Sequence, residues 1–442
     1  MRAPTKIAIA GLLVLGIGLP VAALELPVSI DRPATASRRA EIVPTVATDV
    51  VTVYNSGDLR TDVANRAVAA ARSAGAAVGF GRSASVGMTG LYRGRDAVQL
   101  PPPGFAFPMG TTVLPRDVVG RTMGRDVAQL LTSDSLIMGE LSAGLRGAQA
   151  GDTVMLTASS GATVPLRIAA VLAADRVGGA EFLMSTEAAD RLGIERSSRA
   201  VIWGFASRRT IDAALGANGL VSTSVRIRRS WDPADPDDTI GMAQTKATLG
   251  EFAYRVNPDG SVSQDGAWVN TYLPAERELL NESIPIAARC HTSVGPAIRE
   301  ALAEVAAAGL AATINVSDAN RYGGCHRARF NRLTPDSSLG FLSRHSWAMA
   351  LDTNTQGSCQ GCAPPDLDCR VVQIFRKHGF AWGGNFLTPD GMHFEWVGER
   401  RDLLAYPSRF CPNIATGALA LDNTEIGSSL LYADDGLFVG EH

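Results

Sequence analysis

The sequence predicts an α+β protein with three parts: a hydrophobic N-terminal segment, a β-rich mixed module, and a C-terminal domain built on a mostly antiparallel sheet. Three observations support this division. An apolar run opens the chain, short β-like and Ala-rich helical runs alternate after it, and strand-like alternation returns near the C-terminal end beside several polar side chains. A chain of 442 residues also has room for two or more domains with cores of their own.

Composition limits the classes of function. Charged residues make up 19% of the chain and the formal net charge is -3, which argues against a nucleic-acid-binding protein. All six cysteines fall between Cys290 and Cys411, so only the C-terminal part contains them. An even number of cysteines usually forms disulfides in an exported protein, whereas it more often indicates metal or redox chemistry in a reducing compartment. The compartment therefore decides how these cysteines are interpreted.

The N-terminus indicates export. Arg2 and Lys6 precede an apolar run over residues 7–24 that only Pro20 interrupts, and small residues near its end fit a cleavage signature. Residues 1–24 are therefore expected to be a cleaved signal peptide, or an uncleaved membrane anchor, because the run is close to the length that spans a bilayer. In both cases the rest of the chain would lie outside the cytoplasm.

The module predicted over residues 41–230 follows a linker at 25–40 that is rich in Pro, Ser and Arg. Short β-like runs alternate in it with Ala-rich helical runs, at residues 46–53, 62–71, 126–131 and 134–145. The clearest element is a hairpin over residues 151–173, where Val154 and Leu156 share one face ahead of a Ser-Ser-Gly turn. The sequence of this module shows no cluster of titratable residues, so we expect a structural or partner-binding role.

A turn-rich acidic stretch, S-W-D-P-A-D-P-D-D, marks a second linker over residues 231–245. The domain that follows is expected to cover residues 246–411, and residues 412–442 form a tail that the sequence does not place. Several elements are predicted in this domain from periodicity and turn residues. They are a hairpin and arm over 249–273 with a turn at 257–260, an amphipathic helix over 294–310 ended by Gly309, a strand over 312–316, and a short helix over 371–378 closed by Gly379.

Four polar residues near the C-terminal end point to chemistry: His345, Asp352, Asp390 and His393. Imidazole nitrogens and carboxylate oxygens suit Zn²⁺, and three such side chains with a water form a catalytic site with one open position. Alternation of apolar residues predicts a strand that ends at Asp352, and a second strand, over 392–396, with His393 on its polar side. The alternative is that both histidines are hydrogen-bonded core residues and that both aspartates only form turns.

These residues belong to a set of motifs that is similar to the VanY-like D-alanyl-D-alanine carboxypeptidases, zinc peptidases that act on bacterial cell-wall peptides. The resemblance covers residues 246–397. Its matching pieces are L-G-E-F-A-Y, a C-H before the predicted helix at 294–310, G-G-C with an arginine after it, S-R-H-S-W-A-M-A-L-D-T-N, I-F-R-K-H-G-F-A-W-G-G-N and P-D-G-M-H-F-E-W. They occur in the family's order and at suitable spacing.

The resemblance implies a role for each of these residues. His345, Asp352 and His393 would bind zinc. Asp390 would be the general base that takes a proton from a zinc-bound water, because coordination lowers the pKa of that water to about 7. Arg329, in the loop after G-G-C, would bind a substrate carboxylate with its planar guanidinium.

Some of these roles have rivals, and the family pattern is not matched everywhere. Glu395 lies on the same predicted strand face as His393 and is a rival base, but we interpret it as a partner that orients a metal ligand. The arginines that compete with Arg329 are Arg321, Arg327 and Arg332. Ala348 replaces the family's usual Gly, and Asp390 stands where many members have Glu, so its carboxylate has a shorter reach.

The resemblance also implies a disulfide between Cys290 and Cys325, which would hold the arginine loop against the core. The remaining cysteines are Cys359, Cys362, Cys369 and Cys411. In an exported protein they are expected to form two disulfides rather than a second zinc site, and three pairings are open. Pairing of Cys369 with either member of the C-x-x-C is geometrically easy, and Cys411 would then connect the C-terminal tail to this insert.

A weaker similarity covers residues 136–192, where G-L-R-G-A-Q-A-G-D-T-V-M-L resembles segments of the extracytoplasmic domains of ABC-transporter permeases. It implies a protein partner for the N-terminal module. Short G-D-x-V-x-L patterns also occur in many small β-barrels.

The motifs and the resemblance together predict a zinc-dependent peptidase that hydrolyses peptidoglycan stem peptides, and they favour a D-alanyl-D-alanine carboxypeptidase that uses a zinc-bound water and a carboxylate base. The cofactor would be Zn²⁺ and the substrate a peptidoglycan peptide. The protein would be secreted, or anchored to the cytoplasmic membrane by its N-terminal segment. Two alternatives stay open: a cell-wall endopeptidase, and a catalytically silent wall-binding or sensor domain on the same fold.

Overall fold

The computed structural model describes residues 49–177, 180–321, 324–332 and 339–413, which form one compact unit. The predicted N-terminal segment, the linker at 25–40 and nearly all of the C-terminal tail lie outside the described residues. No helix in the described ranges is long and apolar enough to cross a membrane. The domain limits at 41–230 and 246–411 remain predictions.

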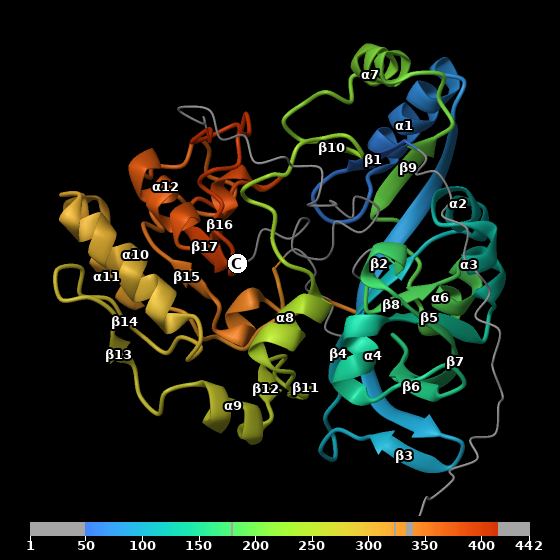
Figure 1. The fold of residues 1–442 in the computed structure, drawn as a ribbon, viewed down its shortest axis with the longest axis horizontal. Coiled ribbons are helices and arrows are strands. Elements are labelled where there is room, and N and C mark those ends of the chain that lie inside the picture. The colour runs from blue at the N-terminus through green and yellow to red at the C-terminus, as the bar shows by residue number, and fades with distance from the viewer. Residues whose placement is uncertain (1–48, 178–179, 322–323, 333–338, 414–442) are drawn as a thin grey trace, which may run out of the picture. The chain divides into compact units, whose positions relative to one another are not determined.

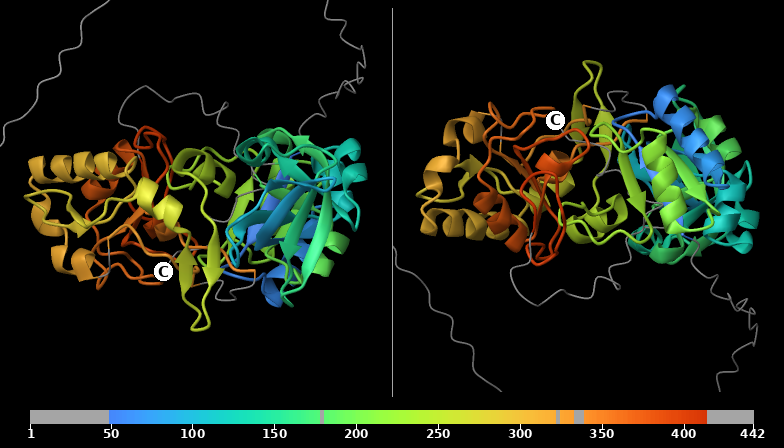
Figure 2. Two further views of the ribbon diagram at one scale, coloured as in Figure 1. Left: turned by 90° about the horizontal axis from the view of Figure 1, so that it is seen from below. Right: turned by 90° about the horizontal axis from the view of Figure 1, so that it is seen from above.

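The N-terminal half begins with a layer made of β1 (Val50–Tyr54), α1 (Thr61–Ser73), the first part of β2 (Ala77–Arg93), β9 (Arg199–Trp203), α7 (Arg208–Ala217) and β10 (Arg226–Arg229). Its strand order is β10-β1-β9-β2, and every pairing is antiparallel. Helices α1 and α7 lie side by side on one face, where their apolar residues pack against Val51, Val53 and Ile202 (Figures 1 and 2). The β-like and helical runs predicted at 46–53 and 62–71 correspond to β1 and α1.

Strand β2 then continues into a closed six-stranded barrel, which runs β2-β4-β8-β5-β7-β6 and back to β2. The barrel strands after β2 are β4 (Phe107–Val113), β5 (Ser135–Gly139), β6 (Thr153–Thr157), β7 (Thr163–Leu172) and β8 (Phe182–Met184), and β3 (Asp96–Gln99) pairs with the end of β2. The pairings β4–β8 and β5–β7 are parallel and the others are antiparallel. The helices around it are α2 (Arg116–Thr122), α3 (Arg125–Leu130), α4 (Glu140–Arg146), α5 (Ala174–Val177) and α6 (Thr186–Leu192).

The hairpin predicted over residues 151–173 is confirmed. Strands β6 and β7 pair antiparallel, with Val154 opposite Leu166, and the turn between them is closed by the Ala158 amide, which donates to the Ala162 carbonyl at 2.8 Å. Alternating residues of these strands are buried in the barrel core, as period-2 patterning requires.

The C-terminal half contains only short strands (Figure 1). Its elements are α8 (Met242–Leu249), β11 (Tyr254–Val256), β12 (Val262–Gln264), α9 (Gly266–Tyr272), β13 (Glu278–Leu279), β14 (Ala287–Ala288), α10 (Gly295–Ala307), η1 (Ala311–Thr313), α11 (Val316–Arg321), η2 (Arg344–Trp347), β15 (Ala350–Asp352), α12 (Cys369–Lys377), β16 (Phe380–Trp382), η3 (Gly383–Asn385) and β17 (His393–Trp396). The predicted helices at 294–310 and 371–378 correspond to α10 and α12, and the glycine after each, Gly309 or Gly379, has a positive φ that ends it.

The sheet that concerns function has the order β15-β17-β16, with both pairings antiparallel. Helix α12 packs on it through Phe375, which stacks on Phe394 at 4.1 Å between ring centroids and meets the edge of Phe380 at 5.4 Å. The chain as a whole is a mixed structure of helices and sheets whose largest element is the barrel. The expectation of a mostly antiparallel α+β fold therefore describes it only in part.

Three local predictions differ from the structure. The strand predicted at 312–316 is wrong, because the Asn315 side chain accepts a hydrogen bond from the Asp318 amide at 3.1 Å and caps the start of α11. The arm after the 257–260 turn is helix α9, capped in the same way by Asp265, which accepts from the Trp268 amide. The Ala-rich run at 134–145 contains strand β5 before helix α4.

The acidic stretch predicted as a linker contains buried charges. Asp235 and Asp237 are each 2% exposed. Asp237 forms a paired contact with the buried Arg376 of α12, with 2.5 Å from Nη2 to Oδ2, and also accepts hydrogen bonds from the Trp382 amide and the Asn385 side chain. The stretch therefore holds the loop after β16, which carries the W-G-G-N motif.

A second buried cluster connects α8 to the barrel. Lys246 of α8 lies 2.9 Å from each carboxylate oxygen of Glu181, which precedes β8, and 3.1 Å from Glu251. Arg146 of α4 also pairs with Glu251, and the two basic side chains and Glu181 are fully buried. Burial by itself would raise the pKa of Glu251, but the charges of Lys246 and Arg146 lower it below its usual value. Two positive and two negative groups thus neutralise each other away from water.

We expect Lys246→Met to destabilise the protein strongly, because Glu181 and Glu251 would share one remaining cation in a buried site. Loss of one partner of a buried ion pair costs about 3–5 kcal/mol. Urea unfolding followed by circular dichroism measures this free energy. The matched control is Lys377→Met, whose pair with Glu304 is 41% and 35% exposed and is expected to contribute about 0–1 kcal/mol. Equal losses for the two variants would contradict this interpretation.

Candidate metal centre

Three residues from separate elements meet at the C-terminal sheet: His345, Asp352 and His393, hereafter the metal triad. One ligand atom from each lies within 4.8 Å of those from the other two, and all three residues are buried. Within the described part of the chain this is the one group of three or more His, Cys, Asp or Glu side chains with that geometry. The residues predicted to bind a metal are therefore close together.

Strand register explains why two members of the triad meet. Strands β15 and β17 pair antiparallel with Asp352 directly opposite His393, so both side chains project from the same face. His345 comes from η2, where its amide donates a hydrogen bond to the hydroxyl of Ser343, the residue that caps the turn, at 3.3 Å. The predicted strand is shorter than the apolar alternation suggested, because Trp347 belongs to η2 and only residues 350–352 pair with β17.

The turn between η2 and β15 depends on Ala348. This residue has φ 53° and ψ 32°, the left-handed region, where a Cβ costs roughly 1–2 kcal/mol. Glycine avoids that cost, which explains why the resembled family usually has Gly at this position. The turn is fixed by two backbone hydrogen bonds: the Ala348 amide donates to the His345 carbonyl, and the Ala348 carbonyl accepts from the His291 amide, both at 3.0 Å.

The two nitrogens of His345 face different partners. Nδ1 lies 2.9 Å from the carbonyl oxygen of Cys325, so this nitrogen carries the hydrogen and donates it. Nε2 lies 3.2 Å from Oδ2 of Asp352, on the side of the triad. Cys325 is in turn bonded to Cys290, so the carbonyl that orients the imidazole is covalently attached to the segment before α10. The disulfide implied by the resemblance is present.

His393 is completely buried between carboxylates. Its Nδ1 lies 3.1 Å from Oδ1 of Asp352, and its Nε2 lies 3.5 Å from Oε2 of Glu395. Burial by itself would lower the pKa of His393, but its contacts with Asp352 and Glu395 and the charges of Asp352 and Asp390 raise the pKa well above its usual value. The surroundings thus favour a positive charge at the triad, whether it is on the imidazole or on a bound cation.

The donor set of the triad fits Zn²⁺. Two imidazoles and one carboxylate are ligands that zinc accepts in catalytic sites, where a fourth position stays open for water or substrate. His345 would offer Nε2, since Nδ1 donates to a carbonyl, and His393 would offer Nδ1, since Nε2 faces Glu395. Asp352 reaches both histidines and completes the set.

Asp390, the predicted base, lies in the turn before β17 and is 0% exposed. Its amide donates to the Gly383 carbonyl at 2.9 Å, and its carbonyl accepts from the His393 amide at 3.1 Å. Its charge is among the causes that raise the pKa of His393. The carboxylate therefore acts electrostatically on the triad from the adjacent turn.

Close packing explains why the W-G-G motif has glycine at position 383. A Cβ on Gly383 would lie 2.6 Å from the Asp390 carbonyl oxygen and 3.2 Å from the Cβ atoms of both Asp390 and His393. Trp382 completes the contact, because its indole NH donates to the Gly391 carbonyl at 2.8 Å. The loop after β16 therefore packs directly on the turn that contains the predicted base.

The C-x-x-C insert packs on the same turn from another side. Cys359 and Cys362 are bonded to each other, and the residues around them bind the turn through backbone contacts. The Gly361 amide donates to the Pro389 carbonyl at 2.6 Å, and the Met392 amide donates to the Ser358 carbonyl at 2.9 Å.

The last cysteine pair differs from the one that looked easiest in the sequence. Cys369 is bonded to Cys411 rather than to Cys359 or Cys362. Cys369 begins α12, and the chain after β17 returns beside this helix, where Arg376 donates to the Cys411 carbonyl at 2.7 Å. All six cysteines are thus in disulfides, as expected for an exported protein.

Arg329, the predicted substrate-binding residue, is half-buried in the segment that runs beside η2. Its amide lies 3.3 Å from the Ser346 hydroxyl, and its carbonyl accepts from the Ser343 amide at 2.9 Å. The rivals Arg327 and Arg332 are exposed, and the side chain of Arg321 lies outside those described. The structure therefore attaches the backbone of Arg329 to the turn that carries His345.

Sequence reasoning missed the residues that support the site from behind. Asp237 lies in a stretch predicted as a linker, and Arg344 was quoted only as part of a motif. Both are buried, and both contact the loops or strands of the site. The only signal in the sequence was the arginine of the S-R-H-S-W motif, which on its own does not distinguish a buried charge from an exposed one.

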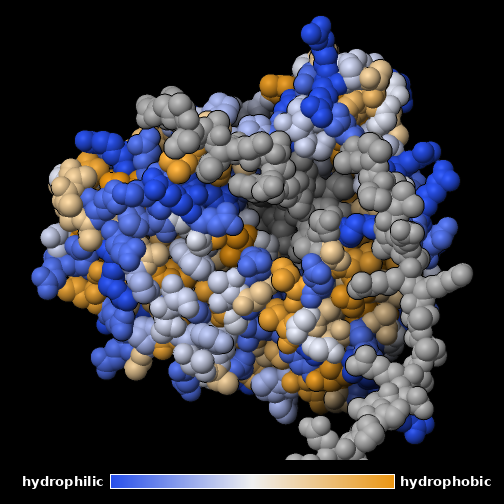
Figure 3. All heavy atoms as spheres, viewed as in Figure 1, coloured by the Kyte–Doolittle hydropathy of each residue, from blue (hydrophilic) through white to orange (hydrophobic). Residues whose placement is uncertain are grey.

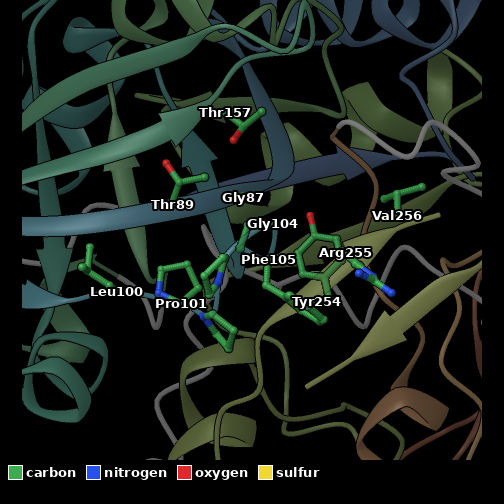
Figure 4. A pocket seen from close by; sticks show the side chains of 13 residues that line it. Gly87, Thr89, Leu100, Pro101, Gly104, Phe105, Thr157, Tyr254, Arg255 and Val256 are labelled. Atoms are coloured by element: carbon green, nitrogen blue, oxygen red, sulfur yellow. The ribbon is translucent and has the colours of Figure 1, made fainter. Parts of the chain in front are cut away.

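A separate hollow of about 610 Å³ lies between the barrel and β11 (Figure 4). Its lining contains a proline-rich loop and none of the triad: Gly87, Thr89, Leu100, Pro101, Pro102, Pro103, Gly104, Phe105, Ala106, Thr157, Tyr254, Arg255 and Val256. Burial raises the pKa of Tyr254 to about 12, and Arg255 lies over the Phe105 ring at 5.2 Å. Apolar and polar side chains are interspersed on the face seen in Figure 3, and Leu100 and Val256 are among the exposed large apolar residues. The residues that line the hollow include no pair of side chains suited to general acid–base catalysis.

Two comparisons with known proteins bear on this geometry. The sequence profile of a family described as D-alanyl-D-alanine carboxypeptidase matches residues 337–396, a segment that contains the metal triad and Asp390. A comparison with curated proteins found no match. Neither comparison supports the predicted similarity of residues 136–192 to ABC-transporter permeases. The chain thus contains a segment similar to a family of zinc-dependent peptidases, and this supports a peptidase.

We expect Gly383→Ala to weaken zinc binding and turnover, because the added methyl would meet the Asp390 carbonyl at 2.6 Å and displace the turn beside His393. Gly144→Ala in α4 is the control, since its Cβ meets nothing within 4 Å. Competition with a chromophoric chelator measures zinc affinity, and circular dichroism verifies that both variants are folded. Equal zinc affinity and turnover in the two variants would show that the close approach of Gly383 is unimportant.

Proposed function

We propose that this protein is a zinc-dependent peptidase that hydrolyses peptidoglycan stem peptides, acting as a D-alanyl-D-alanine carboxypeptidase outside the cytoplasm. The observation that carries the proposal is the buried metal triad inside the segment that matches the carboxypeptidase family. Disulfide bonding of all six cysteines supports an oxidising compartment. The peptidoglycan substrate comes from the family resemblance.

Each residue of the site has a distinct task in this proposal. His345, Asp352 and His393 would hold the zinc. Bound there, Zn²⁺ would polarise the scissile carbonyl and lower the pKa of water. Asp390 takes the proton of the attacking water and passes it to the leaving amine, as a general acid–base residue does. Glu395 orients His393 through Nε2, at 3.5 Å.

The preference for a carboxypeptidase rests on Arg329. A free C-terminal carboxylate needs a cation, and a guanidinium binds it through two parallel hydrogen bonds. The segment with Arg329 is held near His345 by Ser343 and Ser346, and by the Cys290–Cys325 bond. An endopeptidase would need no such cation, so the choice between the two activities can be tested on this side chain.

We expect Asp390→Asn to keep zinc but lower turnover by a factor on the order of 10²–10⁴, the usual contribution of an acid–base group. Asparagine keeps the size of the side chain and the backbone contacts of the turn but accepts no proton. His345→Ala is the comparator and should lose both zinc and cleavage. Zinc content by atomic absorption and release of D-alanine from a stem pentapeptide separate the two effects.

Wild-type protein that holds zinc but cleaves no muropeptide would contradict the peptidase proposal and favour the silent wall-binding alternative. Full activity in a strong chelator would contradict the role of zinc.

We expect Arg329→Ala to raise KM for a stem pentapeptide with a free carboxylate and to leave a C-terminally amidated pentapeptide unaffected, because only the free acid carries the charge that the guanidinium binds. Arg332→Ala, at an exposed position beyond the same segment, is the matched control. Product masses show which bond is cut. Equal cleavage of acid and amide by the wild type would indicate an endopeptidase.

A further inference from the structure

One buried charge beside the triad has no task in the reaction described above: the guanidinium of Arg344. This residue immediately precedes His345 in η2, and it is 1% exposed. A guanidinium out of water is costly unless its hydrogens find acceptors and its charge finds a counter-charge. Its partners therefore indicate why the position is occupied by a charged residue.

The Arg344 guanidinium contacts a carboxylate, a hydroxyl and a backbone carbonyl. Nε lies 3.2 Å from Oε1 of Glu395. Nη1 donates to the hydroxyl of Thr245 in α8 at 2.9 Å, and Nη2 donates to the carbonyl of Ile240 at 2.7 Å. Two of these partners, Ile240 and Thr245, lie just before and within α8, so the guanidinium is fixed from outside the sheet.

Glu395 is the group that Arg344 holds. It lies two residues after His393 on β17, hence on the same face, and it is 0% exposed. Its neighbours across the sheet are Ala350 of β15 and Ala381 of β16, which have no polar side-chain atoms. The carboxylate lies between the two residues, with Oε1 3.2 Å from Nε of Arg344 and Oε2 3.5 Å from Nε2 of His393.

We propose that Arg344 is a positioning residue of the metal centre: it fixes Glu395 as the acceptor for the Nε2 hydrogen of His393, so that Nδ1 faces the metal. The inference rests on the proposed zinc site and extends it. A histidine that binds a metal through one nitrogen usually donates from the other to a carboxylate, which sets the tautomer and raises the basicity of the ligand. Without Arg344 the buried Glu395 would lose the cation that holds its other oxygen.

The experiment measures the zinc affinity of the full chain by competition with a chromophoric chelator. Arg344→Met and Glu395→Gln are each expected to weaken zinc binding by about 10- to 100-fold. The double variant should be no weaker than the weaker single variant, because the two residues act through one contact. Arg344→Lys should lie closer to the wild type, since an ammonium group still pairs with Glu395.

A second measurement separates positioning from general destabilisation. In zinc-loaded protein with ¹⁵N-labelled histidine, NMR should show the hydrogen of His393 on Nε2, and this hydrogen should exchange faster with solvent in Arg344→Met. The control is Arg199→Met, which removes another buried arginine, one in β9 whose Nη2 donates to the Ser83 hydroxyl. This variant should lose stability while the zinc affinity of the folded protein stays at the wild-type value.

The outcomes distinguish this inference from the proposed function. If Arg344→Met and Glu395→Gln, once folded, bind zinc as tightly as Arg199→Met, the positioning role is wrong even when the wild type cleaves stem peptides. If the wild type binds zinc, the variants weaken it and no peptide is cleaved, the peptidase proposal fails and the positioning role stands. A wild type that binds no zinc would overturn both.

Discussion

The pairing of Asp352 with His393 is the constraint on which the candidate site depends. The two strands have three and four residues, too few for backbone hydrogen bonds alone to fix their register. A slip by one residue would turn His393 to the opposite face of the sheet and break the triad. The aromatic contacts of Phe375 with Phe380 and Phe394 hold β16 and β17 under α12, so the apolar core fixes which face of β17 carries His393.

The ligands and the base are supported by different parts of the chain. The ligands depend on strand register and on the Cys325 carbonyl, whereas the turn with Asp390 is enclosed by the W-G-G loop and the C-x-x-C insert. The proposed metal binding and the proposed proton transfer are therefore expected to be separable by substitution. The two parts also place different demands on the sequence. Close packing on the turn requires glycine at position 383, whereas strand β17 requires only that apolar and polar residues alternate.

The sequence was sufficient for residues whose role depends on type and local pattern. The triad, α10 and α12 follow from motifs or from periodicity, and the family resemblance implied the Cys290–Cys325 bond. The sequence was insufficient for features that depend on contacts between distant parts of the chain. Asn315 begins a helix inside an apolar run, Cys369 pairs with Cys411 because the chain returns beside α12, and Asp237 is buried by a distant arginine. The closed barrel could not be predicted from the sequence either, because local alternation of apolar and polar residues does not show which strands pair in parallel.

A continuous series of buried contacts leads from the barrel to the metal centre. Glu181 at the barrel pairs with Lys246, and the neighbouring Thr245 on the same helix accepts from Arg344, whose guanidinium pairs with Glu395 beside His393. Every group in this series is nearly or fully buried, so each position limits the next. One arrangement of these buried groups provides structural support for the site. Allosteric control would require a second arrangement of the same groups, and a ligand at the barrel or at the metal centre would have to favour one arrangement over the other. The barrel therefore contributes to the site as part of its rigid support, through the face of α8 that contains Thr245 and Lys246.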